Sequence, residues 1–143
     1  MKIKNKLLLS VFFTLVSVGV YAEYNQDIVI ETLLKTDTTA LGQRISYHHD
    51  DNAEVTICKV IIPPGKFTGW HKHIIPVFAY VVQGTLTVED EKGNTHIYTQ
   101  NSTISEVYDT YHNGINKGDE AVVLIAIYLG VKGVQVSEKM PDK

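Results

Sequence analysis

The apolar residues of this chain follow two contrasting patterns. From Leu7 to Val20 they form one almost unbroken run of 14 residues. From residue 23 onward, short runs rich in β-branched and aromatic residues alternate with turn signals such as Pro63-Pro64-Gly65 and Lys92-Gly93-Asn94. This alternation is typical of an all-β sandwich or barrel. We therefore predict an all-β fold for the chain after its first 22 residues.

The strand pattern recurs along the chain, and no segment beyond the N-terminal apolar run has a convincing helical period. The predicted strands are Ile28–Leu34, Arg44–Tyr47, Glu54–Ile62, Phe67–His73, Phe78–Gln83, Thr85–Glu89, Thr95–Thr99, Thr103–Val107 and Ala121–Leu129. Asn113-Gly114 is one of the predicted turns. The polar tail Val134–Lys143 is expected to fray or to pack on the outside.

The N-terminal run has the features of a secretory signal peptide. Lys2, Lys4 and Lys6 precede the run, and Val20-Tyr21-Ala22 forms a cleavage site before Glu23. The run is shorter than the roughly 20 residues that a membrane span needs. We predict that residues 1–22 are removed and that residues 23–143 form a single domain in the periplasm or in the secreted fraction. The alternative is an uncleaved N-terminal anchor helix.

The charge of the mature chain disfavours some partners. Removal of the three lysines leaves 10 basic residues against 16 acidic ones, a net charge near −6. Nucleic-acid-binding proteins cluster positive charge, and so do proteins that bind anionic membranes. We therefore expect neither a nucleic acid nor, after signal removal, a membrane as partner. A negative field mildly favours cations.

His71 and His73 are the clearest candidates for chemistry. Residues two apart on a strand point the same way, so both imidazoles can converge on one ion. His112, which follows a predicted strand and a short turn, is the candidate for a third ligand. Imidazoles suit Fe, Zn, Ni and Cu, and also Mn when oxygen ligands join. The alternative is that two histidines share this spacing without binding a metal.

The residues around these histidines resemble the two motifs of the cupin superfamily. Gly65-x5-His71-x-His73, with Gly84 eleven residues on, resembles the first motif, and His112-x3-Asn116 resembles the end of the second. The resemblance spans about residues 54–129. It implies a small cupin-like β-barrel of the jelly-roll type, with a divalent metal ion (Fe, Mn, Zn or Ni) in its mouth and a small-molecule ligand. Such small cupins often form dimers, so a homodimer is expected.

The sequence departs from the family pattern at the fourth ligand. In the family a Glu usually follows the second His by four or five residues, but here Val77 and Phe78 occupy those positions. Either the site is an open three-histidine site, or another carboxylate replaces the missing one. Glu106 is the first candidate, because an acid in an apolar run is unusual unless it is paired. The alternative for Glu106 is a solvated position at a strand edge.

Two further polar residues have a structural and a functional interpretation. His96 shares a strand face with Tyr98, and we expect this face to be turned outward rather than into the barrel. Asn116 matches the motif, but Asn also suits turns.

Two classes of function remain open from the sequence. One is an enzyme that uses the metal for oxygenase, isomerase or lyase chemistry, because an open three-ligand site is the usual arrangement of a catalytic metal. The other is a non-catalytic barrel that binds a metal or a small molecule. The sequence contains no G-x-S-x-G motif, no phosphate-binding glycine loop and no cysteine pair.

Overall fold

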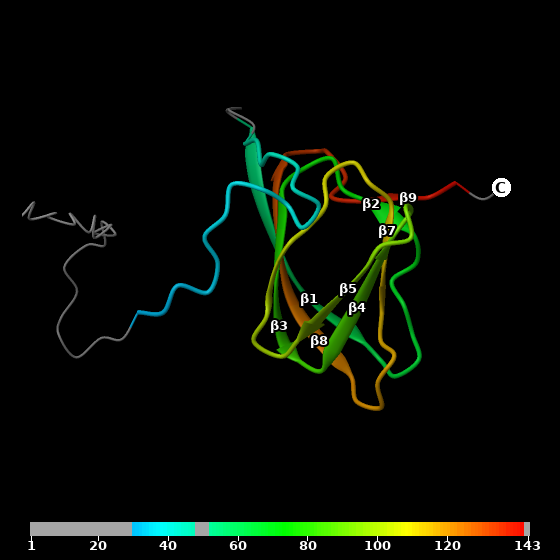
Figure 1. Cartoon of the computed structure of the whole chain (residues 1–143). Helices are drawn as coiled ribbons and strands as arrows, with labels where there is room; N and C mark the ends of the chain where they lie inside the picture. The colour runs from blue at the N-terminus through cyan, green and yellow to red at the C-terminus, as the bar shows by residue number, and fades with distance from the viewer. Residues whose placement is uncertain (1–29, 48–51, 142–143) are drawn as a thin grey trace, which may run out of the picture. The chain divides into compact units, whose positions relative to one another are not determined.

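The computed structural model describes residues 30–47 and 52–141, and within these ranges it contains strands and no helix (Figure 1). The compact unit begins at Thr32. Its strands are β1 (Ala53–Ile62), β2 (His71–Lys72), β3 (Val77–Gln83), β4 (Thr85–Asp90), β5 (Thr95–Thr99), β6 (Thr103–Ser105), β7 (His112–Ile115), β8 (Val122–Val131) and β9 (Glu138–Lys139). The all-β prediction is confirmed.

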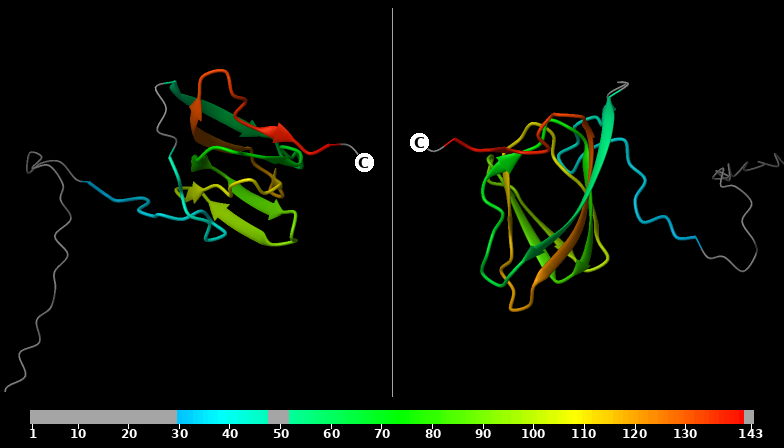
Figure 2. Two further views of the ribbon diagram at one scale, coloured as in Figure 1. Left: turned by 90° about the horizontal axis from the view of Figure 1, so that it is seen from above. Right: turned by 180° about the vertical axis from the view of Figure 1, so that it is seen from behind.

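The first sheet has the strand order β1-β8-β3-β6 and is built around two ten-residue strands. β1 pairs with β8 in an unbroken antiparallel register from Ala53 opposite Val131 to Ile62 opposite Val122. Figure 2 shows these two strands side by side, most clearly in the view from behind. Their side chains alternate, so one face of the sheet points inward and the other outward.

The second sheet has the order β5-β4-β7-β2-β9. The hairpin β4–β5 provides one side of it, and the short strands β7, β2 and β9 provide the other. His112 in β7 lies opposite Asp90 in β4 on one side and opposite His71 in β2 on the other. This register places two of the candidate histidines next to each other.

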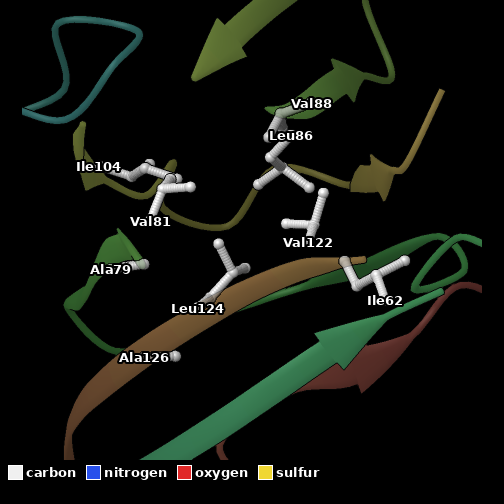
Figure 3. Close-up of a cluster of buried hydrophobic side chains, with 9 residues drawn as sticks. All are labelled: Ile62, Ala79, Val81, Leu86, Val88, Ile104, Val122, Leu124 and Ala126. Carbon is white, nitrogen blue, oxygen red and sulfur yellow. The ribbon is translucent and has the colours of Figure 1, made fainter. Parts of the chain in front are cut away.

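The hydrophobic core lies between the inner faces of the two sheets. Its buried residues are Ile62, Ala79, Val81, Leu86, Val88, Ile104, Val122, Leu124 and Ala126. Figure 3 shows these side chains extending from strands of both sheets into the space between them. The small side chains of Ala79 and Ala126 are direct partners across β3 and β8.

Five of the predicted strands are confirmed with boundaries shifted by at most two residues: β1, β3, β4, β5 and β8. Thr103–Val107 ends as β6 at Ser105. Phe67–His73 is reduced to β2 and to a single bridge between Phe67 and Ile115.

The prediction of a strand at Arg44–Tyr47 is wrong, because only Arg44 takes part in a bridge, with Thr38. The reason is long-range hydrogen bonding by Gln43, the residue that precedes this segment. The amide of Gln43 donates to the carbonyl oxygen of Tyr108, and the backbone N–H of Tyr108 donates to Gln43 Oε1. These bonds tie the segment to a loop rather than to a strand. Residues 30–34 also form no strand, and positions 28 and 29 lie outside the described residues.

The predicted turn at Asn113-Gly114 is also wrong, because both residues lie within β7. The backbone of Gly114 does not have a positive φ. A side chain there would come within 3.3 Å of the Thr68 methyl carbon and 3.4 Å of Leu86 Cδ1. Glycine at this position therefore allows neighbouring chain segments to pack closely and does not form a turn.

None of the described residues belongs to a helix that is long and apolar enough to cross a membrane. The predicted signal peptide, residues 1–22, lies outside the described residues.

Candidate metal centre

His71, His73 and His112 meet at one end of the space between the sheets, and we call them the three-histidine cluster. Each offers a ring nitrogen, and these nitrogens all lie within 4.8 Å of one another. The ring centroids are 4.5 to 5.2 Å apart. His73 and His112 are buried, and His71 is half-buried. The three side chains are therefore close enough to hold one metal ion.

The backbone explains this convergence. His71 and His112 are antiparallel partners across β2 and β7. His73 is two residues beyond His71, so its side chain returns to the same side of the chain. The spacing in the sequence predicts the pair, and the register of β2 and β7 adds the third member.

Each ring of the cluster is fixed by a hydrogen bond from Nδ1 to a backbone carbonyl oxygen. A carbonyl oxygen only accepts, so each Nδ1 carries the proton and each neutral ring leaves Nε2 with a free lone pair. Such bonds are the usual means of orienting metal-binding histidines. The pairs are His71 with Gly69 at 2.8 Å, His73 with Val136 at 2.7 Å, and His112 with Thr110 at 3.0 Å.

Burial keeps the three imidazoles uncharged. It lowers the pKa of His73 to about 4, against the opposing effect of the Val136 hydrogen bond. Burial also lowers the pKa values of His71 and His112 below the usual range of histidine. At neutral pH the cluster therefore presents neutral nitrogen donors, which is the form that binds metals.

Glu106 lies beside the cluster. Its Oε2 atom is 3.7 Å from Nε2 of His112, and its side chain is only 13% exposed. Burial raises the pKa of Glu106 to about 7, and the nearby His71 opposes this rise. Because the pKa of His112 is lowered, its imidazole is neutral near pH 7, where Glu106 is only partly ionised, so the contact is not a fixed ion pair. The alternative of a solvated edge position does not describe this side chain.

Glu106 lies next to the part of β3 where the motif Glu is missing. The backbone N–H of Glu106 donates to the carbonyl oxygen of Val77 at 2.9 Å. Val77 is one of the two positions, with Phe78, at which the motif that the sequence resembles usually has its Glu. The chain thus brings a carboxylate to this part of the barrel from the neighbouring segment instead of from β3.

The cluster opens into a cavity of about 80 Å³, which has a mouth to solvent. Glu106 and the three histidines contribute polar atoms at one end. Thr68 and Tyr128 add hydroxyl groups, and the rest of the wall is formed by core residues such as Leu86 and Leu124. The ring of Tyr128 meets that of His73 edge-on, with centroids 5.6 Å apart.

Sequence reasoning missed several of these features. Tyr128 could have been found, because it alternates with Leu124 and Ala126 on the inner face of β8. Thr68, whose Oγ1 accepts from the backbone N–H of Gly114, has no comparable pattern. The carbonyl of Val136 could not be found at all, since a backbone group leaves no signature in the sequence.

His96 and Asn116 do not join the cluster. The prediction that His96 faces outward is wrong. Its Nε2 is buried without a hydrogen-bond partner, and it shares a face with Tyr98, which packs against the core. Asn116 is buried and structural. Its amide donates to the carbonyl oxygens of Ile62 and Glu120, and its Oδ1 accepts from the N–H of Gly118.

Comparison with known proteins agrees with this architecture. Residues 58–128 match the family model described as the Cupin domain. No curated protein matches the chain significantly. The chain therefore contains a domain of the cupin superfamily, and its two sheets form the jelly-roll barrel of that fold.

Solved structures of similar fold come from several bacteria. A cupin-like protein of Thermotoga maritima has a TM-score of 0.55 and 21% identity, over 60% of this chain and 64% of that chain. The DMSP lyase DddQ of Ruegeria pomeroyi has a TM-score of 0.52 and 12% identity, over 59% of this chain and 42% of that chain. A Bacillus halodurans protein has a TM-score of 0.51 and 19% identity, over 57% and 67% respectively. The chain spans less than two thirds of the first two structures, and at these identities the likeness concerns the fold.

Proposed function

We propose that this chain binds one divalent metal ion through His71, His73 and His112 and uses it to act on a small molecule. The observation that carries this proposal is the hydrogen bonding of the cluster. All three Nδ1 atoms donate to backbone carbonyl oxygens, so three Nε2 lone pairs remain available at one end of a cavity. A cluster of histidines with only a structural role would have no need for three matching tautomers.

The donor set suits Fe, Mn, Zn or Ni. Neutral imidazole nitrogens bind each of these ions, and a carboxylate oxygen broadens the choice toward Mn and Fe. Three protein ligands leave coordination positions for a substrate or for water, which is the arrangement of catalytic rather than structural sites. When bound, such a metal would polarise a substrate oxygen or activate water or dioxygen.

Glu106 is the residue that we propose for proton transfer or as a fourth ligand. Its pKa of about 7 lies close to neutral pH, where a group is best able both to accept and to return a proton. A reaction that moves a proton beside a metal-held oxygen, as in an isomerase or a lyase, would use this property. The DMSP lyase of similar fold is one protein whose name states a reaction of the second kind.

We further propose that the protein is exported and forms a homodimer. Export is supported by the basic, apolar and cleavage-site pattern of residues 1–22. The dimer is supported by the outer face of the first sheet. There Val55, Ile57 and Ile61 on the edge strand β1 are 57–65% exposed. An exposed apolar patch on a strand that forms the edge of the described sheet is typical of an interaction surface, and a twofold axis lets one patch cover its copy.

Substitution of one histidine tests the metal site. Metal-free protein without an affinity His tag is dialysed against Zn²⁺, and the bound metal is measured. We expect one ion per chain for the wild type and loss of that ion for His112→Ala. His96→Ala is the matched control, because it removes a histidine of the same barrel that lies outside the cluster, and it should keep its metal.

Folding must be checked by circular dichroism, because His112 is buried. His71→Ala provides a second variant at a half-buried position and should lose metal as well. If His112→Ala and His71→Ala both fold and both retain one ion per chain, the proposed site is wrong.

A further inference from the structure

The depth of the cavity comes from two alanines. Ala79 and Ala126 face each other across β3 and β8, and both line the cavity. Larger residues at this pair of positions would fill the space beneath the histidines. Val60, Leu86 and Leu124 continue the same apolar wall. The cavity therefore has a polar end at the cluster and an apolar interior.

No lysine or arginine is among the described residues that line this cavity. Lys72 is adjacent to His71 in the sequence, but its side chain lies elsewhere. Its Nζ atom is 2.6 Å from Asp109 Oδ1 and 3.7 Å from Glu138 Oε2, so its charge is already matched. A bound anion would thus find positive charge only at the metal proposed above.

This distribution of charge limits which ligands can bind in the cavity. An anionic group that contacts the metal is compensated, whereas a second anionic group would meet aliphatic side chains and no cationic side chain, with only the hydroxyl groups of Thr68 and Tyr128 as further donors. Burying a charge without a partner is strongly unfavourable. A hydrocarbon body, in contrast, gains free energy when apolar walls remove it from water. Neither statement depends on the protonation of Glu106, which adds no positive charge in either form.

We infer that the cavity binds a small molecule with a single anionic oxygen group at the metal and an apolar body directed toward Ala79 and Ala126. The inference rests on the proposed metal site. It assigns the ligand to the class of small apolar monoanions, and it excludes phosphate esters and dicarboxylates as preferred ligands.

Two carboxylates of equal length test this inference. Hexanoate and hexanedioate both have six carbons, and they differ by one terminal carboxylate. Zn²⁺-loaded protein is titrated with each, and with acetate, in a calorimeter. We expect hexanoate to bind at least tenfold more tightly than hexanedioate and also more tightly than acetate. Equal or tighter binding of hexanedioate, or no gain from acetate to hexanoate, overturns the inference.

A substitution at Ala126 or Ala79 tests where the apolar part of the ligand lies in the cavity. Ala126→Val adds two methyl groups beneath the cluster and should weaken hexanoate at least fivefold while leaving acetate and the Zn²⁺ content unchanged. Ala79→Val is a second variant of the same design. Ala53→Val, at an exposed position of β1, is the matched control and should bind hexanoate as the wild type does.

The two proposals fail in distinguishable ways. If the wild type does not load with Zn²⁺, both the metal site and the ligand class are wrong. If it loads with one ion per chain but does not discriminate between the carboxylates, only the ligand class is wrong. Hexanoate binding that is equal in folded Ala126→Val, Ala79→Val and wild-type protein contradicts the placement of the apolar body.

Discussion

At the scale of single residues, Glu106 is a buried carboxyl group beside the three-histidine cluster. Its pKa is raised from 4.5 to about 7 because burial disfavours the charged form. The folded protein therefore holds the proton more tightly than the unfolded chain does. The resulting stabilisation is complete below pH 4.5 and is lost as the pH rises through 7. It amounts to about 3 kcal/mol, since one pKa unit corresponds to about 1.4 kcal/mol.

Because ionisation of Glu106 lowers the stability of the folded protein as the pH rises, a prediction follows for Glu106→Gln. Glutamine stays neutral at every pH, so the variant avoids the cost of an ionised buried carboxylate. We expect the metal-free variant to gain up to about 3 kcal/mol of unfolding free energy relative to the wild type between pH 4.5 and pH 8. Urea unfolding at both pH values measures this change. If the variant and the wild type differ in unfolding free energy by the same amount at pH 4.5 and at pH 8, the carboxylate is well solvated.

The same variant separates the two roles of Glu106 when metal is present. If the carboxylate binds the ion or orients a ligand, Glu106→Gln should lower the affinity for Zn²⁺ by about 10- to 100-fold. If Glu106 only transfers protons, the affinity should stay near that of the wild type and the loss should appear in turnover. Competition with a chelator measures the affinity.

The site residues differ in how far the sequence could predict them. The i, i+2 spacing of His71 and His73 is enough to predict a shared face, and His112 follows from the motif. Glu106 could be proposed because it is an acid in an apolar run. What the sequence could not show is the orientation of the rings. That depends on which backbone carbonyls fold against each Nδ1, and Val136 is 63 residues away from His73 in the chain.

At the scale of elements, the C-terminal segment is the part that sequence patterns described least well. Of its two predicted alternatives, fraying or packing on the outside, the second describes it, because it forms the exposed strand β9, which pairs with β2 at the edge of the second sheet. The N–H of Met140 also donates to the carbonyl oxygen of Trp70. Figure 1 shows this segment, in red, beside β2. A two-residue strand of Glu and Lys has no apolar alternation, so no local pattern indicates it.

Removal of this segment should therefore weaken the metal site. We predict that a chain ending at Gln135 folds but binds Zn²⁺ about 10- to 100-fold more weakly, because His73 loses the acceptor that orients its ring. A chain ending at Met140 is the control, since it keeps Val136 and β9. Equal Zn²⁺ affinity of the two truncated chains would mean that this contact does not position His73.

At the scale of the whole molecule, the outer face of the first sheet continues the apolar pattern across three strands. Ile57 of β1, Ile127 of β8 and Phe78 of β3 are partners in register and so share one face. The inner face of the same strands forms the core. A sheet that is apolar on both faces is typical of one that is covered on both sides, and a second copy of the chain is the cover that we propose.

A charge at the centre of this face should prevent that association. We predict that Ile57→Lys halves the mass measured by light scattering while leaving the Zn²⁺ content unchanged. Ile97→Lys, at a similarly exposed position of β5 in the other sheet, should retain the mass of the wild type. A monomeric wild type, or an Ile57→Lys variant with the mass of the wild type, would contradict the proposed interface.

The central claim is that the three-histidine cluster holds a metal ion, and a thermal unfolding experiment on tag-free, metal-free protein tests it most directly. A ligand that binds only the native state at about 100 times its dissociation constant adds about 2.7 kcal/mol of stability. For a domain of this size that corresponds to a rise of roughly 10 °C in Tm. We expect Zn²⁺ to produce such a rise and to saturate at one ion per chain. A Tm that is the same with and without Zn²⁺, with no bound metal, would contradict the account.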